Sequence, residues 1–291
     1  MGWFIHHVNL QAHDVIEAAA FYREIIGLRD GVWAYPETVG YVGHDPETIA
    51  AFGSENRGIH LCRAIPEFPL RNNFFHNPTI GGHFAINTFD VDAVKARLEQ
   101  AGHIVSEAGV YAMAGIRQIY AYDPFQNVIE VNETVDKSGG ASPSEDEAHD
   151  VRLEEGDWYL HHVQIPAHDV GKTAAYFRDV IGLPEGEWGT PDGSDVAPSE
   201  HGQFAFFGKD HRGIHIVKPS AAAGRQAGFH HNPTVGPCMA LGVSDLDAVK
   251  RRLEDAAVVY TDAGLDSATG LRRIYCYDPS MNLIEVNQKA A

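Results

Sequence analysis

The first residues alternate between apolar and polar side chains, and the residues after them follow a helical period. FIHHVNL, which begins at Phe4, has the period of two that is typical of a half-buried strand. The next segment, HDVIEAAAFYREIIGL, has apolar residues at helical spacing; Asp14 can cap this helix with Glu17 three residues on, and Gly27 can end it. The pattern therefore predicts a strand followed by one helix.

The first half of the chain goes through this order of elements twice. Three short runs typical of strands follow the first helix, at residues 31–35, 48–53 and 58–63. The strand HFAINTFD then begins a second cycle, in which Asp90 can cap the helix VDAVKARLEQAG. The last strands are expected near residue 104 and at residues 116–122 and 128–132. Each cycle therefore has the order βαβββ.

The whole first half returns in the second half at a constant shift of 155 residues. WFIHHV at Trp3 returns as WYLHHV, RGIH returns unchanged, and IYAYDPFQNVIEVN returns as IYCYDPSMNLIEVN. We therefore predict an α+β protein of four βαβββ units in two tandem domains, residues 1–135 and 158–291. Residues 136–157 are rich in Ser, Gly and acidic side chains and are expected to form a flexible linker.

Composition and charge exclude several classes of binding partner but do not identify the function. The net charge of -18 argues against nucleic acid and against an anionic membrane surface, and residues 136–157 account for -6 of it. No apolar run reaches the roughly 20 residues that span a bilayer, and the N-terminus lacks the pattern of a signal peptide, so a cytoplasmic protein is expected. Three widely spaced cysteines form no CxxC pair, so neither a disulfide framework nor a thiolate zinc cluster is indicated.

Strand alternation puts four side chains that can bind metals on the face of the sheet that apolar residues leave free. They are His7, His60, His83 and Glu130. Two imidazoles and a carboxylate on separate strands suit a divalent cation and leave positions for substrate; ferrous iron fits best, with manganese, nickel and zinc as competitors. For any one of these residues taken alone, a buried and hydrogen-bonded side chain is the simpler interpretation.

These motifs resemble the vicinal oxygen chelate superfamily, which includes glyoxalases, bleomycin- and fosfomycin-resistance proteins, methylmalonyl-CoA epimerases and extradiol dioxygenases. The resemblance rests on HHVNL with the FYREIIGL helix, on GGHFAIN and on YDPFQNVIEVN, and it covers both copies. It implies paired βαβββ units whose mixed sheets curl around a metal, with His7, His83 and Glu130 as ligands. It further implies that His60 is a fourth ligand or an acid and base beside the metal, and that Tyr120 contacts the substrate.

The second copy has His162, His215, Glu285 and Tyr275 at the matching positions, but Cys238 where the first copy has a histidine. A thiolate is a poor match for a ferrous site of two histidines and a carboxylate. Two interpretations stay open: a second site that has lost catalysis, or a different site that contains a thiolate. The sequence also leaves open whether each site lies within one copy or is shared between copies.

The expected function is that of a metal-dependent enzyme with a small-molecule substrate and no organic cofactor, acting as a monomer or a homo-oligomer. The first hypothesis is extradiol ring cleavage of a catechol-like compound at Fe²⁺, with His60 and Tyr120 as catalytic residues. The alternatives are a glyoxalase- or epimerase-like lyase or isomerase, and a non-catalytic binding module similar to bleomycin-resistance proteins. His76 and His231, in FFHNPTIGG and FHHNPTVGP, are expected to stabilise turns rather than to line a cavity.

Overall fold

The chain forms two compact units. The computed structural model describes residues 3–31, 49–53, 57–88, 90–110, 115–124, 126–134, 158–186, 202–209, 212–266 and 270–290. Unit 1 comprises Met1–Ile16, Asp30–Val151 and Ala175–Leu183, and unit 2 comprises Glu17–Arg29, Arg152–Ala174 and Pro184–Ala291. Each unit therefore contains most of one repeat and a short helical segment of the other. The expected linker at 136–157 lies outside the described residues.

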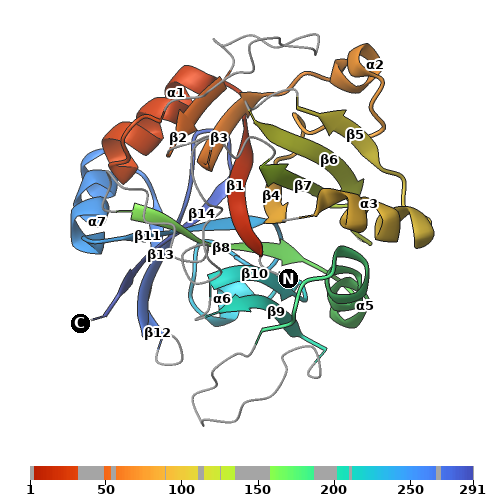
Figure 1. Ribbon diagram of the computed structural model, residues 1–291. Helices are drawn as coiled ribbons and strands as arrows, with labels where there is room; N and C mark the ends of the chain where they lie inside the picture. The colour runs from red at the N-terminus through yellow and green to blue at the C-terminus, as the bar shows by residue number, and fades with distance from the viewer. Residues whose placement is uncertain are drawn as a thin grey trace. The chain divides into compact units, whose positions relative to one another are not determined.

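The described part of unit 1 contains a seven-stranded mixed sheet in the order β2-β3-β1-β4-β7-β6-β5 (Figure 1). The strands are β1 (Trp3–Ala12), β2 (Ile49–Phe52), β3 (Gly58–Arg63), β4 (His83–Thr88), β5 (Ser106–Gly109), β6 (Ile116–Tyr122) and β7 (Val128–Thr134). β1 runs parallel to β3 and antiparallel to β4, and β4 runs parallel to β7. The first strand of each βαβββ cycle therefore lies at the centre of the sheet.

Unit 2 repeats this topology in the residues that the structure describes, with the order β12-β13-β14-β11-β8-β10-β9. The strands are β8 (Trp158–Pro166), β9 (Phe204–Lys209), β10 (Arg212–Val217), β11 (Cys238–Val243), β12 (Tyr260–Asp266), β13 (Leu271–Tyr277) and β14 (Leu283–Lys289). β11 and β14 are parallel neighbours, as β4 and β7 are in unit 1. The internal repeat of the sequence is thus a repeat of the sheet.

The two longest helices begin where the sequence predicts. In α3 (Val91–Gln100) the Asp90 side chain accepts a hydrogen bond from the amide of Ala93, and Asp245 caps α7 (Leu246–Asp255) in the same way. The apolar residues of α3 at helical spacing, Val91, Val94 and Leu98, are fully buried, and α3 contacts β6 and β7. These helices cover the face of each sheet that carries the apolar residues.

The first helix of each repeat is not the single α-helix that the sequence predicts. It begins as α1 (Val15–Ala20) and continues as the π-helical η1 (Phe21–Ile26); α5 (Val170–Ala175) and η3 (Tyr176–Ile181) repeat this pattern. Gly27 ends η1 in the left-handed conformation, as predicted. Within unit 2, Arg252 of α7 donates hydrogen bonds to the last carbonyls of η1 at Ile25 and Ile26. The C-terminal carbonyls of the π-helix η1 are therefore capped by a side chain from the other repeat.

A β-bulge in β1 changes the simple alternation that the sequence suggests. Ile5 pairs with Ile86 and His7 pairs with Ala85, so His6 is an extra residue with no partner of its own on β4. Ile5, just before the bulge, therefore lies on the opposite face from the one that alternation assigns to it. The face assignment of His7 and the residues after it is unchanged.

Other expectations differ locally. The strand expected near residue 104 is β5, and it begins at Ser106: Ile104 is 54% exposed and the left-handed Gly102 turns the chain before it. The strand expected at 31–35 falls almost wholly outside the described residues. The short helices α2 (Phe68–Asn72) and α6 (Ala223–Gln226) were not predicted. Among the described helices, none is long and apolar enough to cross a membrane.

Candidate metal centre

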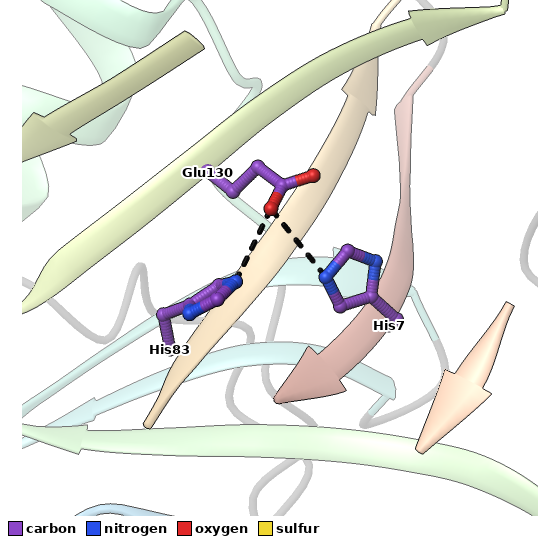
Figure 2. Close-up of side chains that lie close together, drawn as sticks. All are labelled: His7, His83 and Glu130. Carbon is purple, nitrogen blue, oxygen red and sulfur yellow. Dashed lines mark hydrogen bonds and ion pairs between the residues drawn. The ribbon is translucent and has the colours of Figure 1, made fainter. Parts of the chain in front are cut away.

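Three of the side chains that the sequence places on the free face of the sheet converge in unit 1. His7 comes from β1, His83 from β4 and Glu130 from β7 (Figure 2). Glu130 Oε2 lies 3.1 Å from His83 Nε2 and 3.5 Å from His7 Nε2. The three ligand atoms all lie within 4.8 Å of one another. Because these strands are neighbours, one short stretch of sheet brings the whole group together.

The second oxygen of Glu130 is held by amide groups. Gln118 Nε2 donates to Glu130 Oε1 at 2.8 Å, and Asn132 Nδ2 donates to the same oxygen at 3.2 Å. Burial opposes ionisation, but His7 and His83 hold the pKa of Glu130 well below its usual range. A buried carboxylate with one oxygen fixed by neutral donors therefore presents the other oxygen to the two histidines.

Both imidazoles are oriented through the nitrogen that faces away from Glu130. His83 Nδ1 donates to the carbonyl of Pro78 at 2.9 Å, which leaves Nε2 to act as a ligand. His7 Nδ1 lies 3.0 Å from Nδ1 of His6, the bulged residue. Burial lowers the pKa of His7, against the opposite effect of Glu130, and this favours the neutral ring that a metal requires. The bulge thus places His6 next to Nδ1 of His7, the nitrogen that does not face Glu130.

This donor set fits a divalent transition metal. Two imidazoles and one carboxylate that converge from three strands are a donor set that divalent transition metals accept, and three protein ligands leave coordination positions open. Their outer hydrogen bonds to a carbonyl, an imidazole and two amides are the supports that metal-ligating side chains usually have. His7, His83 and Glu130 are therefore able to hold the metal that the sequence suggests.

His60 and Tyr120 lie beside this group but are not part of it. The His60 ring stacks on the His7 ring, with centroids 4.0 Å apart and planes inclined by 25°. Tyr120 meets His83 edge to face at 5.8 Å, and its hydroxyl accepts a hydrogen bond from Gln118 at 3.3 Å. Both side chains are buried, so each can act on a molecule bound next to the three ligand atoms.

The matching residues of unit 2 are arranged differently. His162 Nε2 lies 3.9 Å from Glu285 Oε2, and His215 stacks on His162 at 3.9 Å. Cys238 packs in an apolar cluster with Tyr275, and its thiol points to the carbonyl of Met239 at 3.7 Å. Burial raises the pKa of the Cys238 thiol well above its usual value and also raises that of Glu285. Among the described residues, only His7, His83 and Glu130 bring three such ligand atoms within 4.8 Å of one another, so His162, Cys238 and Glu285 do not reproduce the geometry of the first site.

Sequence reasoning missed the residues that support the ligands. Gln118 and Asn132 each lie two residues from a predicted site residue on the same strand, so strand alternation alone could have placed them on the same face. His6 could not be found this way, because alternation assigns it to the apolar face. The double histidine of HHVNL, repeated at His161, was the available signal.

His76 and His231 join their loops to a neighbouring strand, whereas the turn expected at Asn77-Pro78 is held by hydrogen bonds between Asn77 and Thr79. His76 Nδ1 lies 2.8 Å from the Ser106 hydroxyl, which also accepts hydrogen bonds from the amides of Phe75 and His76. His231 and Thr261 repeat this arrangement, again at 2.8 Å. Burial lowers the pKa of His76 to about 4. A buried neutral ring that bonds the hydroxyl of a neighbouring strand is part of the scaffold.

Comparison with known proteins agrees with this geometry. Both repeats match the Glyoxalase/Bleomycin resistance protein/Dioxygenase superfamily, over residues 4–131 and 159–286. A search of curated proteins finds no significant match.

Solved structures of a glyoxalase and of a dioxygenase each resemble the chain over nearly its whole length. The Mn(II)-bound glyoxalase from Novosphingobium aromaticivorans matches with a TM-score of 0.62 and 18% identity, covering 99% of this chain and 82% of that one. The 2,3-dioxygenase LapB from Pseudomonas sp. KL28 matches with a TM-score of 0.62 and 14% identity, covering 100% and 94%. At these identities the likeness shows a shared fold. Together with the family match in each repeat, it establishes that the chain belongs to the glyoxalase/bleomycin resistance protein/dioxygenase superfamily.

Proposed function

We propose that the chain is a metal-dependent enzyme that cleaves the ring of a catechol-like compound with dioxygen, using Fe²⁺ held by His7, His83 and Glu130. One observation carries the choice: the structure brings three ligand atoms together, while His60 stacks on His7 outside the group. Three protein ligands leave room for both oxygens of a diol and for a second small ligand. Bound Fe²⁺ would supply Lewis acidity and redox chemistry at this position.

The residues around the site have the properties that this reaction needs. A diol must lose protons when it binds and the ring-opened product must regain one, and His60 is the buried imidazole next to the ligands that can carry a proton in both directions. The Tyr120 hydroxyl can donate a hydrogen bond to a substrate oxygen and thereby fix the orientation of the ring. One dioxygen enters the product for each ring opened, so no external reductant is required.

A second candidate is a lyase or isomerase that uses the same ligands. It is favoured by the Mn(II)-bound glyoxalase, which resembles the chain as closely as the dioxygenase LapB does by TM-score. In that case His7, His83 and Glu130 would hold a metal that supplies Lewis acidity to a substrate with two neighbouring oxygens, and His60 would be a ligand or a base. Such a reaction consumes no oxygen.

Anaerobic reconstitution distinguishes the two candidates. The purified chain is loaded with Fe²⁺, mixed with a panel of catechols and then exposed to oxygen, while absorbance and oxygen uptake are recorded together. We expect a yellow ring-fission product and one dioxygen consumed per product formed. Turnover of a panel of hemithioacetals and epimerisable thioesters with nickel, cobalt or zinc under nitrogen, and no oxygen uptake with any catechol, would instead support the lyase or isomerase.

A further inference from the structure

The second repeat differs from the first at more than its cysteine. The residue that corresponds to Gln118 at the shift of 155 is Arg273. Gln118 is the neutral amide that donates to Glu130 at 2.8 Å. Its replacement puts a permanent positive charge at the place where the first repeat has an uncharged donor.

Pairing within the sheet places Arg273 beside the second carboxylate. On β13 and β14, Arg273 lies opposite Asn287 and Tyr275 lies opposite Glu285. Asn287 donates to Glu285 Oε1 at 3.0 Å, as Asn132 does to Glu130. The four residues therefore form one block on the same face of the sheet, as their counterparts do in unit 1.

Arg273 is fixed in this block rather than free in solvent. One end of its guanidinium pairs with Asp266 at 3.0 Å, and its Nε is buried without a hydrogen-bond partner. Burial raises the pKa of Glu285, and the charge of Arg273 acts in the opposite direction and lowers it. Asp266, the ion-pair partner of Arg273, offsets part of this effect by raising the pKa of Glu285. The charge of Glu285 is therefore already balanced in part by the chain itself.

Among the described residues, the first carboxylate has no hydrogen-bond or ion-pair partner with a permanent positive charge, although the charge of Arg57 acts on His6 nearby. Its hydrogen-bond and ion-pair partners are two amides and two imidazoles that are neutral in the metal-binding state. An external cation can therefore complete the balance of charge at Glu130, whereas at Glu285 it would meet a guanidinium of like charge.

We propose that Arg273 takes the place of the metal in the second repeat, and that this repeat is a metal-independent copy of the site. The exchange of His83 for Cys238 removes a ligand, and the exchange of Gln118 for Arg273 supplies the missing positive charge from within the chain. The two exchanges act together, so restoring the ligand alone does not restore metal binding. The proposal depends on the metal site of unit 1 and is independent of the reaction that the site catalyses.

Metal stoichiometry tests this proposal directly. The probe is Mn²⁺ alone, titrated into metal-free protein by isothermal calorimetry, with bound metal counted by atomic emission after dialysis. We expect about one Mn²⁺ per chain for the wild type and for Cys238→His, and about two for Cys238→His/Arg273→Gln. At the second site we expect the double variant to bind at least about tenfold more tightly than the single variant, because the like charge is gone.

The reverse exchange in unit 1 is the matched control. Gln118→Arg keeps His7, His83 and Glu130 but introduces the charge, and we expect it to weaken Mn²⁺ binding by at least about tenfold. Gln118→Ala removes only the hydrogen bond to Glu130, so its smaller loss measures that contribution separately. The melting temperature and circular dichroism spectrum of each variant establish that it is folded.

Several results would overturn the proposal. They are a second Mn²⁺ bound by the wild type, equal affinity at the second site of Cys238→His with and without Arg273→Gln, and a folded double variant that binds only one Mn²⁺. If the double variant does not fold, Gln118→Arg decides: wild-type affinity refutes the role of the charge, and lost affinity supports it. A wild type that binds no Mn²⁺ or Fe²⁺ refutes the metal site of the proposed function, while the affinities at the second site still test Arg273.

Discussion

Glu130 and Glu285 occupy matching places in two sheets of the same topology, and both are almost completely buried, at 1% and 3% exposure. Their neighbours differ. Glu130 lies against two histidines and two amides, whereas Glu285 has one histidine at 3.9 Å, one amide, the hydroxyl of Tyr275 and a nearby arginine. Burial raises the pKa of Glu285, while the histidines reverse that effect at Glu130. Burial alone therefore does not make a metal site; the charge of the neighbouring side chains decides.

The scaffold around the two carboxylates is far better preserved. Both repeats keep the capping aspartate of the longer helix, the left-handed glycine that ends the π-helix and the bulge at the double histidine. The hydroxyl at Ser106 becomes Thr261 without a change in its hydrogen bond to histidine. The second sheet therefore retains its architecture with Cys238 in place of the histidine, so this topology does not require His83.

Loss of a first-site ligand should have the largest effect. His83→Ala removes an imidazole that no neighbouring side chain replaces, so bound Fe²⁺ should fall from about one per chain to near zero, and turnover with it. Cys238→Ala, the matched change in unit 2, should leave both unchanged. The measurements are metal content after anaerobic dialysis and steady-state rate; loss of a metal ion in the cysteine variant would show that both repeats bind metal.

Removal of the stacked histidine should affect the reaction without affecting the metal. His60→Ala is expected to lower kcat by about 100- to 10,000-fold, the usual contribution of an acid and base, with Fe²⁺ content unchanged. His215→Ala removes the equally stacked ring of unit 2 and should have no effect on kcat. A His60 variant that loses its metal as well would identify this residue as a fourth ligand.

The bulged histidine should tune the metal site by a smaller amount. His6→Ala leaves His7 Nδ1 without its partner, so affinity for Fe²⁺ or Mn²⁺ should fall by about 10- to 100-fold. Restoration of most of this affinity by His6→Asn, which can still accept a hydrogen bond, would show that the partner orients the ligand. His161→Ala serves as the control, and equal losses in both variants would indicate a general effect on the strand.

The hydrogen bond between a hydroxyl and a buried histidine, Ser106 with His76 and Thr261 with His231, should give the smallest difference between the repeats. Ser106→Ala and Thr261→Ala each remove a hydroxyl that bonds a buried histidine, so each should lower the free energy of unfolding by about 1 kcal/mol. Ser106→Thr should stay within about 0.5 kcal/mol of the wild type, because unit 2 already carries threonine there. Chemical denaturation measures the free energy of unfolding of each variant. A large decrease for Ser106→Thr would reveal that the surroundings of Ser106 and Thr261 are packed differently.

The sequence predicts most of the fold because its signals are local. Strand alternation and helix capping depend on side chains a few residues apart. For this reason the sequence correctly predicts that Asp90 caps α3, that Gly27 ends the first helix, and that Glu130 lies on the face of β7 opposite the apolar residues. The bulge at His6 depends on the pairing of β1 with β4, and one extra residue leaves no trace in the composition of either strand. The switch to a π-helix after Ala20 recurs after Ala175, and the helical spacing of apolar residues does not reveal it.

The candidate site was predicted in its ligand types but not in its supports. Alternation placed His7, His83 and Glu130 on one face, and the sheet order brought them together. The ligand atoms that do not face the metal are held by groups on other strands and loops. The roles of the Gln118 amide and the Pro78 carbonyl therefore become visible only in the folded sheet. The charge of Arg273 was visible in the sequence, but its meaning requires the register of β13 with β14.

The bulge also identifies the residue whose deletion the strand can best tolerate. Ile5 and His7 pair with Ile86 and Ala85, which are consecutive, so a chain without His6 could form a regular ladder with these pairs in place. Deletion of a residue between His7 and Asn9 would instead shift the ligand out of register. β1 is thus one residue longer than its pairing needs, and it uses the surplus residue to hold His7 in position.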